Sequence, residues 1–243
     1  MAKHIKDPKE IFPEIIKDYK EIFGNDLISI ILYGSAAGKD YRPGKSDINF
    51  MIVLSEEGIE HLDKAFRTLS RWQKRRVAVP LFLTENYIET SLDVFPIEYL
   101  NFQRNHILVY GRDVLKDLSF NPELVRLQCE REIKGKLLLL REAFLETGGK
   151  GRALREVMIQ SIQAFLAFFD ALLYLKGEEI PEKRRDAIRK TGETLQLDAG
   201  LFEKLLDIKE EKIKPNDAEI NLIFKNYLKE VRKLSKIADS LRG

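Results

Sequence analysis

The sequence predicts a small α/β domain followed by an all-α domain, and two observations lead to this fold class. Up to about residue 117, short β-branched apolar runs alternate with amphipathic helical segments. That alternation is typical of a small sheet with helices packed on it. From residue 118 onward nothing reads as a strand, and long helical segments joined by short loops predict a bundle. We therefore expect an α/β (α+β) domain over residues 1–117 and a helical bundle over residues 118–243.

The first domain is expected to contain five strands and two helices. In Pro8–Phe23, isoleucines recur on one helical face. Leu27–Tyr33 is a continuous apolar run, which is typical of a strand covered on both faces. The segment from Gly34 to Ser46 is rich in Gly, Lys, Asp and Pro, so it is expected to be a loop whose first residues open a short helix. The other expected elements are the strands Ile48–Leu54, Val77–Leu83, Val94–Leu100 and His106–Tyr110 and the helix Glu57–Trp72.

The second domain is expected to be a bundle of five helices. Asn121 is the expected cap of the first, with Pro122 at its first helical position. The apolar stretch Ile159–Leu175 contains four polar residues, which would be costly in lipid, so it predicts a core helix and no membrane span. The expected helices are Pro122–Thr147, Ala153–Leu175, Pro181–Gln196, Ala199–Glu211 and Asp217–Arg242.

Composition narrows the functional classes. A net charge of +2 gives no general attraction for nucleic acid, so any basic partner site must be local. The single cysteine, Cys129, excludes an intramolecular disulfide and a cysteine-clustered zinc site, and its helical context predicts a buried thiol. The amino terminus is polar from its start and does not resemble a signal peptide. We expect a cytoplasmic protein, and the sequence carries no signal for its oligomeric state.

The chemistry of the chain is concentrated between residues 32 and 54. An apolar strand runs into Gly34 and Ser35, and after a charged loop Asp47 and Asn49 open a second apolar strand. Period-two alternation puts Asp47 and Asn49 on the same face of that strand. Gly34 permits close approach of a ligand to the backbone, and Ser35 adds a hydroxyl, so the turn is a candidate phosphate site. Lys45, with Lys39 and Arg42, either meets the phosphates or belongs to an ordinary solvated loop.

These residues resemble the nucleotidyltransferase superfamily, which includes the kanamycin and streptomycin nucleotidyltransferases and the minimal nucleotidyltransferases. The shared pattern is Gly-Ser, about a dozen residues, then Asp-x-Asp followed by apolar residues. The resemblance implies a catalytic core over about residues 10–110. It also implies that Gly34 and Ser35 hold a nucleoside triphosphate, that Mg²⁺ or Mn²⁺ binds at positions 47 and 49, and that a later strand supplies a third carboxylate. An appended helical domain is common in similar enzymes.

The sequence departs from the family pattern at Asn49, which stands where the second aspartate is expected. An amide offers one oxygen to a hard cation but no negative charge, whereas paired metal ions depend on carboxylates to offset their mutual repulsion. By analogy with the family, the third carboxylate is either Glu98, inside an apolar segment where an acid would need a partner, or Asp93. We take Asp47, Asn49 and Glu98 as the candidate catalytic and metal-binding set.

Three functional hypotheses follow from the resemblance. The first is an enzyme that transfers a nucleotidyl group to an unknown acceptor, either a small molecule or a protein. The second is a nucleotide-binding or protein-interaction module without catalysis, and the third is one half of a toxin–antitoxin pair. The basic run from Arg71 to Arg76 either contacts nucleic acid or completes a helix end, which cations favour. His4, His61 and His106 lack metal-ligand spacing and are expected at the surface or in turns.

Overall fold

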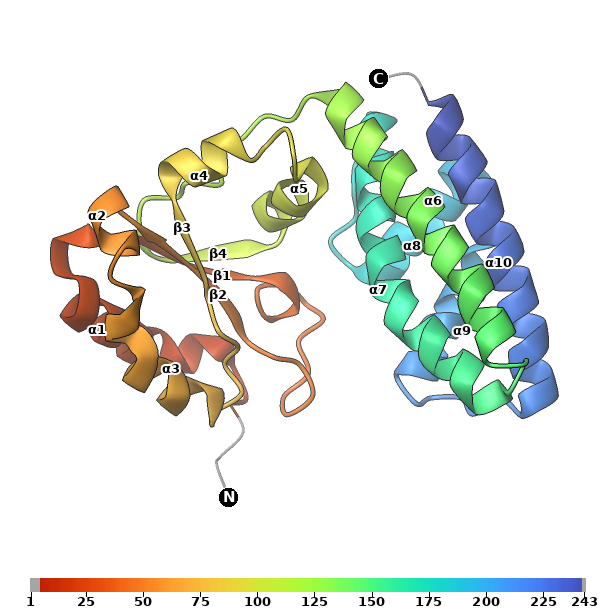
Figure 1. Ribbon diagram of the computed structural model, residues 1–243, viewed down its shortest axis with the longest axis horizontal. Helices are drawn as coiled ribbons and strands as arrows, with labels where there is room; N and C mark the ends of the chain where they lie inside the picture. Colours follow the sequence, from red (N-terminus) through yellow and green to blue (C-terminus); the bar gives the residue numbers. More distant parts are fainter. Residues whose placement is uncertain (1–4, 242–243) are drawn as a thin grey trace. The chain divides into compact units, whose positions relative to one another are not determined.

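The apolar run Leu27–Tyr33 forms one of two central strands in a mixed four-stranded sheet. The computed structural model describes residues 5–241. The strand order is β3-β2-β1-β4, in which β1 is antiparallel to both of its neighbours and β2 is parallel to β3 (Figure 1). The strands are β1 (Leu27–Tyr33), β2 (Asn49–Leu54), β3 (Leu81–Thr84) and β4 (His106–Gly111).

Helices cover both faces of this sheet (Figure 1). On one face, β1 and β2 side chains such as Leu32 and Phe50 form a core with Tyr19 of α1 and Trp72 of α3. Met51 of β2 is buried and, by strand alternation, points to the other face, on the side where Figure 1 shows α4 and α5. The first unit contains η1 (Pro8–Ile11), α1 (Phe12–Phe23), η2 (Gly24–Asp26), η3 (Gly34–Ala36), α2 (Glu56–Ile59), η4 (Leu62–Ala65), α3 (Phe66–Gln73), α4 (Glu85–Thr90) and α5 (Pro96–Arg104).

Two expected elements are interrupted. The helix expected over Glu57–Trp72 is split into α2, η4 and α3, because His61 leaves the helical conformation between the first two pieces. The strand expected over Val77–Leu83 pairs continuously only from Leu81, after an isolated bridge between Val77 and Ile48. Pro80 lies between these two pairings and has no N–H to donate to a strand ladder.

One expected strand is wrong: Val94–Leu100 contains most of the first two turns of α5. Pro96 occupies the first helical turn, where its missing N–H costs nothing. Glu98 is exposed while Ile97, Tyr99 and Leu100 are buried, which is a helical pattern of burial. The short helix α4 was not expected at all, and the side chain of Thr84 caps it by accepting from the Tyr87 N–H.

Gly111, at the end of β4, allows a close approach between two strands. Its φ is +80°, and an added Cβ would lie 1.9 Å from the carbonyl oxygen of Ile28. Gly111→Ala is therefore expected to cost more than the about 1–2 kcal/mol that left-handed backbone costs a residue with a Cβ. Denaturant unfolding followed by fluorescence measures this, since Trp72 is the only tryptophan and is buried in the first unit.

Gly24→Ala is the matched control for this prediction. Gly24 has a φ of +54° and no atom within 4 Å of an added Cβ, so alanine there also takes a positive φ but meets no clash. Equal losses of unfolding free energy in the two variants would contradict the close approach to Ile28.

The chain divides into two compact units, the first ending at Ser119 and the second beginning at Phe120. The second unit is helical throughout its described elements. Asn121 caps α6 as expected, since its side chain accepts from the Glu123 N–H at 2.9 Å. The expected helix end at Arg242 lies outside the described residues, as does His4. The helices are α6 (Pro122–Glu146), α7 (Gly151–Leu175), α8 (Arg184–Leu195), α9 (Ala199–Lys209) and α10 (Asp217–Ser240).

Helix α7 forms the core of the second unit. It packs against α6, α8, α9 and α10, and its Phe165 and Phe169 stack edge-on against Tyr227 and Phe202. By length and composition α7 is the one described helix that could cross a membrane, with half of its most apolar window buried inside the structure. A core helix satisfies the same test. Cys129 of α6 is buried, as expected.

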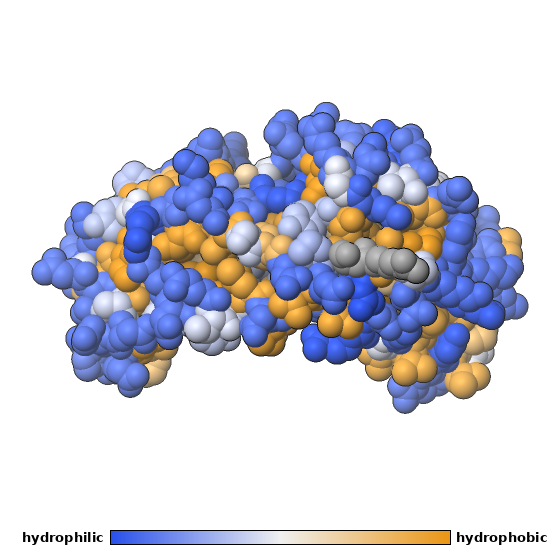
Figure 2. Space-filling view, turned by 90° about the horizontal axis from the view of Figure 1, so that it is seen from above, coloured by the Kyte–Doolittle hydropathy of each residue, from blue (hydrophilic) through white to orange (hydrophobic). Residues whose placement is uncertain are grey.

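The face of the molecule seen in Figure 2 is largely hydrophilic, with apolar patches between the hydrophilic residues.

Candidate functional site

The Gly34 turn lies directly after β1 and beside Asn49. Gly34 has a φ of +74°, and an added Cβ would lie 3.6 Å from the Nδ2 atom of Asn49. The Gly34 N–H donates to the carbonyl of Asn105 at 3.1 Å, and the Ala37 N–H donates to the carbonyl of Gly34 at 3.0 Å. The N–H groups of Gly34 and Ala37 are therefore already bonded within the protein, and the candidates for a phosphate contact are the Ser35 N–H and the Ser35 hydroxyl.

Asp47 and Asn49 flank Ile48, which is buried in the core shared with α1 and α3. Since successive side chains of a strand point to opposite faces, Asn49 points away from that core, and Asp47, which precedes β2, is expected on the same side. The backbone of Ile48 is fixed by bonds on both sides: its N–H donates to Arg76 and its carbonyl accepts from Ala78. Asp47 is exposed and Asn49 is half-buried.

The loop before Asp47 is closed by its own hydrogen bonds. The Lys45 and Ser46 N–H groups donate to the carbonyl of Arg42, and the Arg42 N–H donates to the Ser46 hydroxyl. The guanidinium of Arg76 donates to the carbonyl of Gly44, which ties the loop to the end of α3. Lys45 is exposed on this turn, close in sequence to Asp47.

Three residues form a row across the sheet at this end. Tyr33 of β1 is paired with Asn49 of β2 on one side and with His106 of β4 on the other. Directly opposed residues in neighbouring strands share a face, so all three lie on the side covered by α5. The ring of Phe102, in α5, packs edge-on against Tyr33 at 4.8 Å, and burial raises the pKa of the Tyr33 hydroxyl. Helix α5 therefore borders the candidate site.

Glu98 does not lie inside a buried strand, although its apolar sequence context predicts one. It is exposed in the first turn of α5, and Asp93 is exposed in the preceding turn. Helix placement removes the cost that made a metal partner necessary. The third carboxylate thus stays a prediction that rests on the family resemblance alone.

The sheet itself supplies few metal ligands. None of its four strands contains an aspartate or glutamate, and the segment that pairs with β2 on its parallel side, residues 77–84, also contains none. Within residues 5–241, no group of three His, Cys, Asp or Glu side chains could hold a metal ion. Asp47 and the amide oxygen of Asn49 are hard oxygen donors, which fit one divalent ion that shares its coordination with phosphate oxygens. Two ions would need more carboxylates than the sheet provides.

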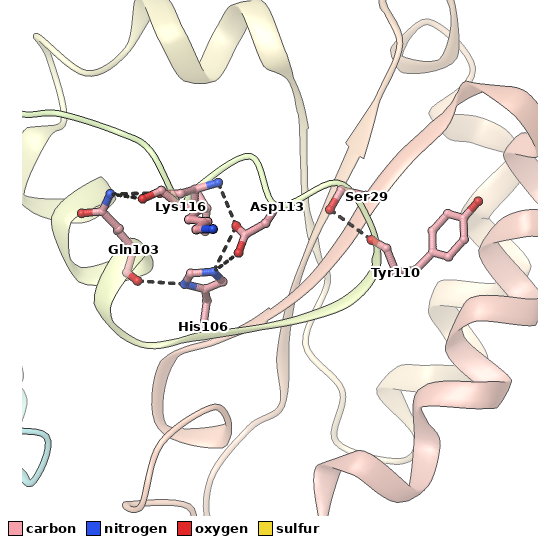
Figure 3. A network of polar contacts seen from close by, with 7 residues as sticks. Ser29, Gln103, His106, Tyr110, Asp113 and Lys116 are labelled. Atoms are coloured by element: carbon pink, nitrogen blue, oxygen red, sulfur yellow. Dashed lines mark hydrogen bonds and ion pairs between the residues drawn. The ribbon is translucent and has the colours of Figure 1, made fainter.

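A polar network adjoins this row and was not expected from the sequence (Figure 3). His106 was expected at the surface or in a turn, but its side chain is only 13% exposed and both ring nitrogens are bonded. Nδ1 lies 2.8 Å from the carbonyl of Gln103, and Nε2 lies 3.0 Å from the carboxylate of Asp113. Burial alone would raise the pKa of Asp113, but bonds from His106 and from backbone N–H groups outweigh burial and lower that pKa.

The basic run from Arg71 to Arg76 has structural partners. Arg71 and the Trp72 indole both bond the carboxylate of Asp18 in α1, and Arg75 pairs with Glu14 at 2.5 Å. Arg75 also lies over the Trp72 ring. These contacts fasten α3 to α1, so Arg71 and Arg75 have a structural role within the first unit.

Comparison with known proteins identifies the fold. No family model matches the sequence, and no curated protein matches it. Among solved structures, the chain is similar to spectinomycin adenyltransferase AAD(9) from Enterococcus faecialis, whose structure was solved with ATP and spectinomycin. The TM-score is 0.51 and the identity 16%, over 91% of this chain and 98% of that one. At this identity the likeness establishes the fold, and the expected nucleotidyltransferase fold with an appended helical region is confirmed.

Proposed function

We propose that this chain binds a nucleoside triphosphate with one Mg²⁺ or Mn²⁺ ion and transfers a nucleotidyl group to a small-molecule acceptor in the cytoplasm. The observation that carries the proposal is the placement of Gly34 against Asn49, 3.6 Å from an added Cβ to Nδ2, on a fold similar to that of an adenyltransferase. The two halves of the motif are separated by about a dozen residues in sequence, and they meet at one end of the sheet.

Each residue has a defined task in the proposal. Gly34 lets the triphosphate approach the backbone, and the Ser35 hydroxyl donates a hydrogen bond to a phosphate oxygen. Lys45 adds a positive charge for the phosphates. Asp47 and Asn49 would hold the ion, which when bound offsets the charge of the triphosphate. Catalysis consists mainly of positioning the acceptor hydroxyl in line with the α-phosphorus, with pyrophosphate as the leaving group.

Glu98 remains in the proposal as a third acidic group, now supplied by α5. An acceptor hydroxyl must lose its proton during transfer, and an exposed carboxylate on the helix that borders the site is a candidate to take it. With Asp47 as the only carboxylate next to β2 in the motif, we expect transfer to be slow.

A second candidate function is nucleotide binding without transfer. It is favoured by the same absence of acids from the four strands, since binding needs only the turn and one ion, whereas fast transfer needs more charge.

A direct assay separates these two functions and tests the proposal. Each of the four labelled nucleoside triphosphates is incubated with the full chain, Mg²⁺ or Mn²⁺, and a panel of aminoglycoside and aminocyclitol acceptors that includes spectinomycin. We expect saturable binding and an acceptor whose mass rises by one nucleotidyl group, with pyrophosphate released in equal amount.

Asp47→Asn should lose the metal-dependent part of binding. The matched control is Asp40→Asn, which removes the same charge from an exposed position of the same loop and should bind as the wild type does. Binding without any transfer would favour the second function. If no triphosphate binds at all, both functions fail.

A further inference from the structure

We propose that His106 and Asp113 are positioning residues that hold the Gly34 turn in its binding shape through the carbonyl of Asn105. The proposal rests on the proposed function only for its effect on triphosphate affinity. The contacts that carry it run from the carboxylate of Asp113 through the His106 ring to the backbone on either side of Asn105.

The His106 ring is held by two acceptors. Its Nδ1 faces the carbonyl of Gln103 at 2.8 Å, and its Nε2 faces both carboxylate oxygens of Asp113 at 3.0 and 3.1 Å. A carboxylate only accepts, so Nε2 donates to Asp113, and the ring and the carboxylate form a hydrogen-bonded pair. With side-chain exposures of 13% and 25%, the pair is largely shielded from water.

Asn105 transmits this restraint to the Gly34 turn. It directly precedes His106, its own N–H donates to Asn101 in the last turn of α5, and its carbonyl accepts from the Gly34 N–H at 3.1 Å. The same residue also borders the loop after the turn, because an added Cβ at Gly38 would lie 3.9 Å from the Asn105 Oδ1 atom. Asn105 is therefore fixed by α5 on one side and by the anchored His106 on the other.

The turn between α5 and β4, which contains Asn105, is also bonded to the segment that leads out of the first unit (Figure 3). The side-chain amide of Gln103 lies within 2.8–3.1 Å of the carbonyls of Leu115, Lys116 and Leu118. The Leu115 N–H donates to Asp113 at 3.1 Å. These bonds immobilise the carboxylate that holds His106, so its geometry does not depend on a mobile surface chain.

Breaking the pair should loosen the turn more than it loosens the sheet. Without the charge of Asp113, the shielded His106 ring loses a charge-assisted hydrogen bond, which costs more than losing the same bond at an exposed position. The ring can then move, and the Asn105 carbonyl is no longer fixed against Gly34.

The test compares Asp113→Asn and His106→Gln with the wild type in the full chain. Amide hydrogen exchange read by NMR reports the Gly34 N–H directly, and calorimetry with ATP and Mg²⁺ reports affinity. Losing a charge-assisted hydrogen bond should speed Gly34 exchange and weaken ATP binding by about tenfold each, while amides of the β1–β2 ladder exchange as in the wild type.

Asp26→Asn is the matched control. Asp26 accepts from the Ser55 hydroxyl at 2.6 Å at the opposite end of β1 and β2, so its loss affects stability without touching the turn. Unfolding followed through Trp72 shows whether the variants are equally destabilised. Unchanged Gly34 exchange in both His106→Gln and Asp113→Asn would overturn the proposal.

The test remains informative if the variants do not fold or if the wild type does not bind ATP. If neither variant folds, amide exchange in the wild type still tests the proposal. A Gly34 N–H that exchanges as fast as that of Ser35 would refute the bond to Asn105. Should the wild type bind no ATP, the proposed function fails while the exchange measurement continues to judge the positioning role.

Discussion

Gly34→Val is expected to abolish nucleoside triphosphate binding while the first unit stays folded. Valine brings two γ-carbons to a position where an added Cβ already reaches within 3.6 Å of Asn49, so it fills the space between the turn and β2. It also places a β-branched residue at a φ of +74°, which costs about 1–2 kcal/mol. Calorimetry with ATP and Mg²⁺ measures the binding, and Trp72 fluorescence during unfolding measures the stability.

Two companion variants separate occlusion from backbone strain. Gly24→Val also places a β-branched residue at a positive φ, but in open space, and should bind ATP as the wild type does. Gly34→Ala places one carbon at ordinary contact distance from Asn49 and should bind with intermediate affinity. Wild-type affinity in Gly34→Val would remove the turn from the binding site.

The sequence predicted the elements whose burial is complete on both faces. β1 begins and ends where expected, because a seven-residue apolar run ended by a glycine has one reading. β2 starts one residue later than expected, because Ile48, the expected first residue, forms only an isolated bridge with Val77. The cap at Asn121 followed from local chemistry, since a side-chain oxygen that accepts from a nearby N–H needs no distant partner.

The segment around Pro96 shows where such reasoning fails. A short apolar run with one acid is compatible with a strand or with a helix packed on a core, and periodicity over seven residues does not distinguish them. The helix prevails because Ile97 and Leu100, three residues apart, are buried together while Glu98 faces solvent. The same change moved the expected third carboxylate from a strand to the surface of α5.

Part of the candidate site was predictable and part was not. Asp47, Asn49 and Gly34 follow from strand alternation and a turn glycine, and the backbone brings Gly34 and Asn49 together. The bonds among Gln103, His106 and Asp113 arise when a helix, a strand and a connecting segment fold against each other. The sequence around His106, a single histidine at the start of an apolar run, does not indicate which residue it will pair with in the fold.

Asn49→Asp is expected to strengthen Mg²⁺-dependent ATP binding by about tenfold or more, since opposite charges about 4 Å apart attract by about 4 kcal/mol in a partly screened site before desolvation is subtracted. The substitution keeps the shape of the side chain, so the pairing of position 49 with Tyr33 need not change. Calorimetry at fixed salt, with and without Mg²⁺, measures the metal-dependent increment, and the labelled-nucleotide assay measures transfer.

The other half of the motif supplies the comparison that interprets the result. Asp47→Asn removes the one carboxylate that the motif retains and should erase the increment in the wild type. In Asn49→Asp combined with Asp47→Asn, the single carboxylate is moved by two residues on one face, so a restored increment would show that both positions reach the ion. If Asn49→Asp leaves Mg²⁺ affinity unchanged, position 49 does not face the ion and the motif assignment is wrong. If it raises both affinity and transfer, the amide of the natural chain is what slows the reaction. If it raises affinity alone, the acids missing from the sheet are limiting, and nucleotide binding is the function of this site.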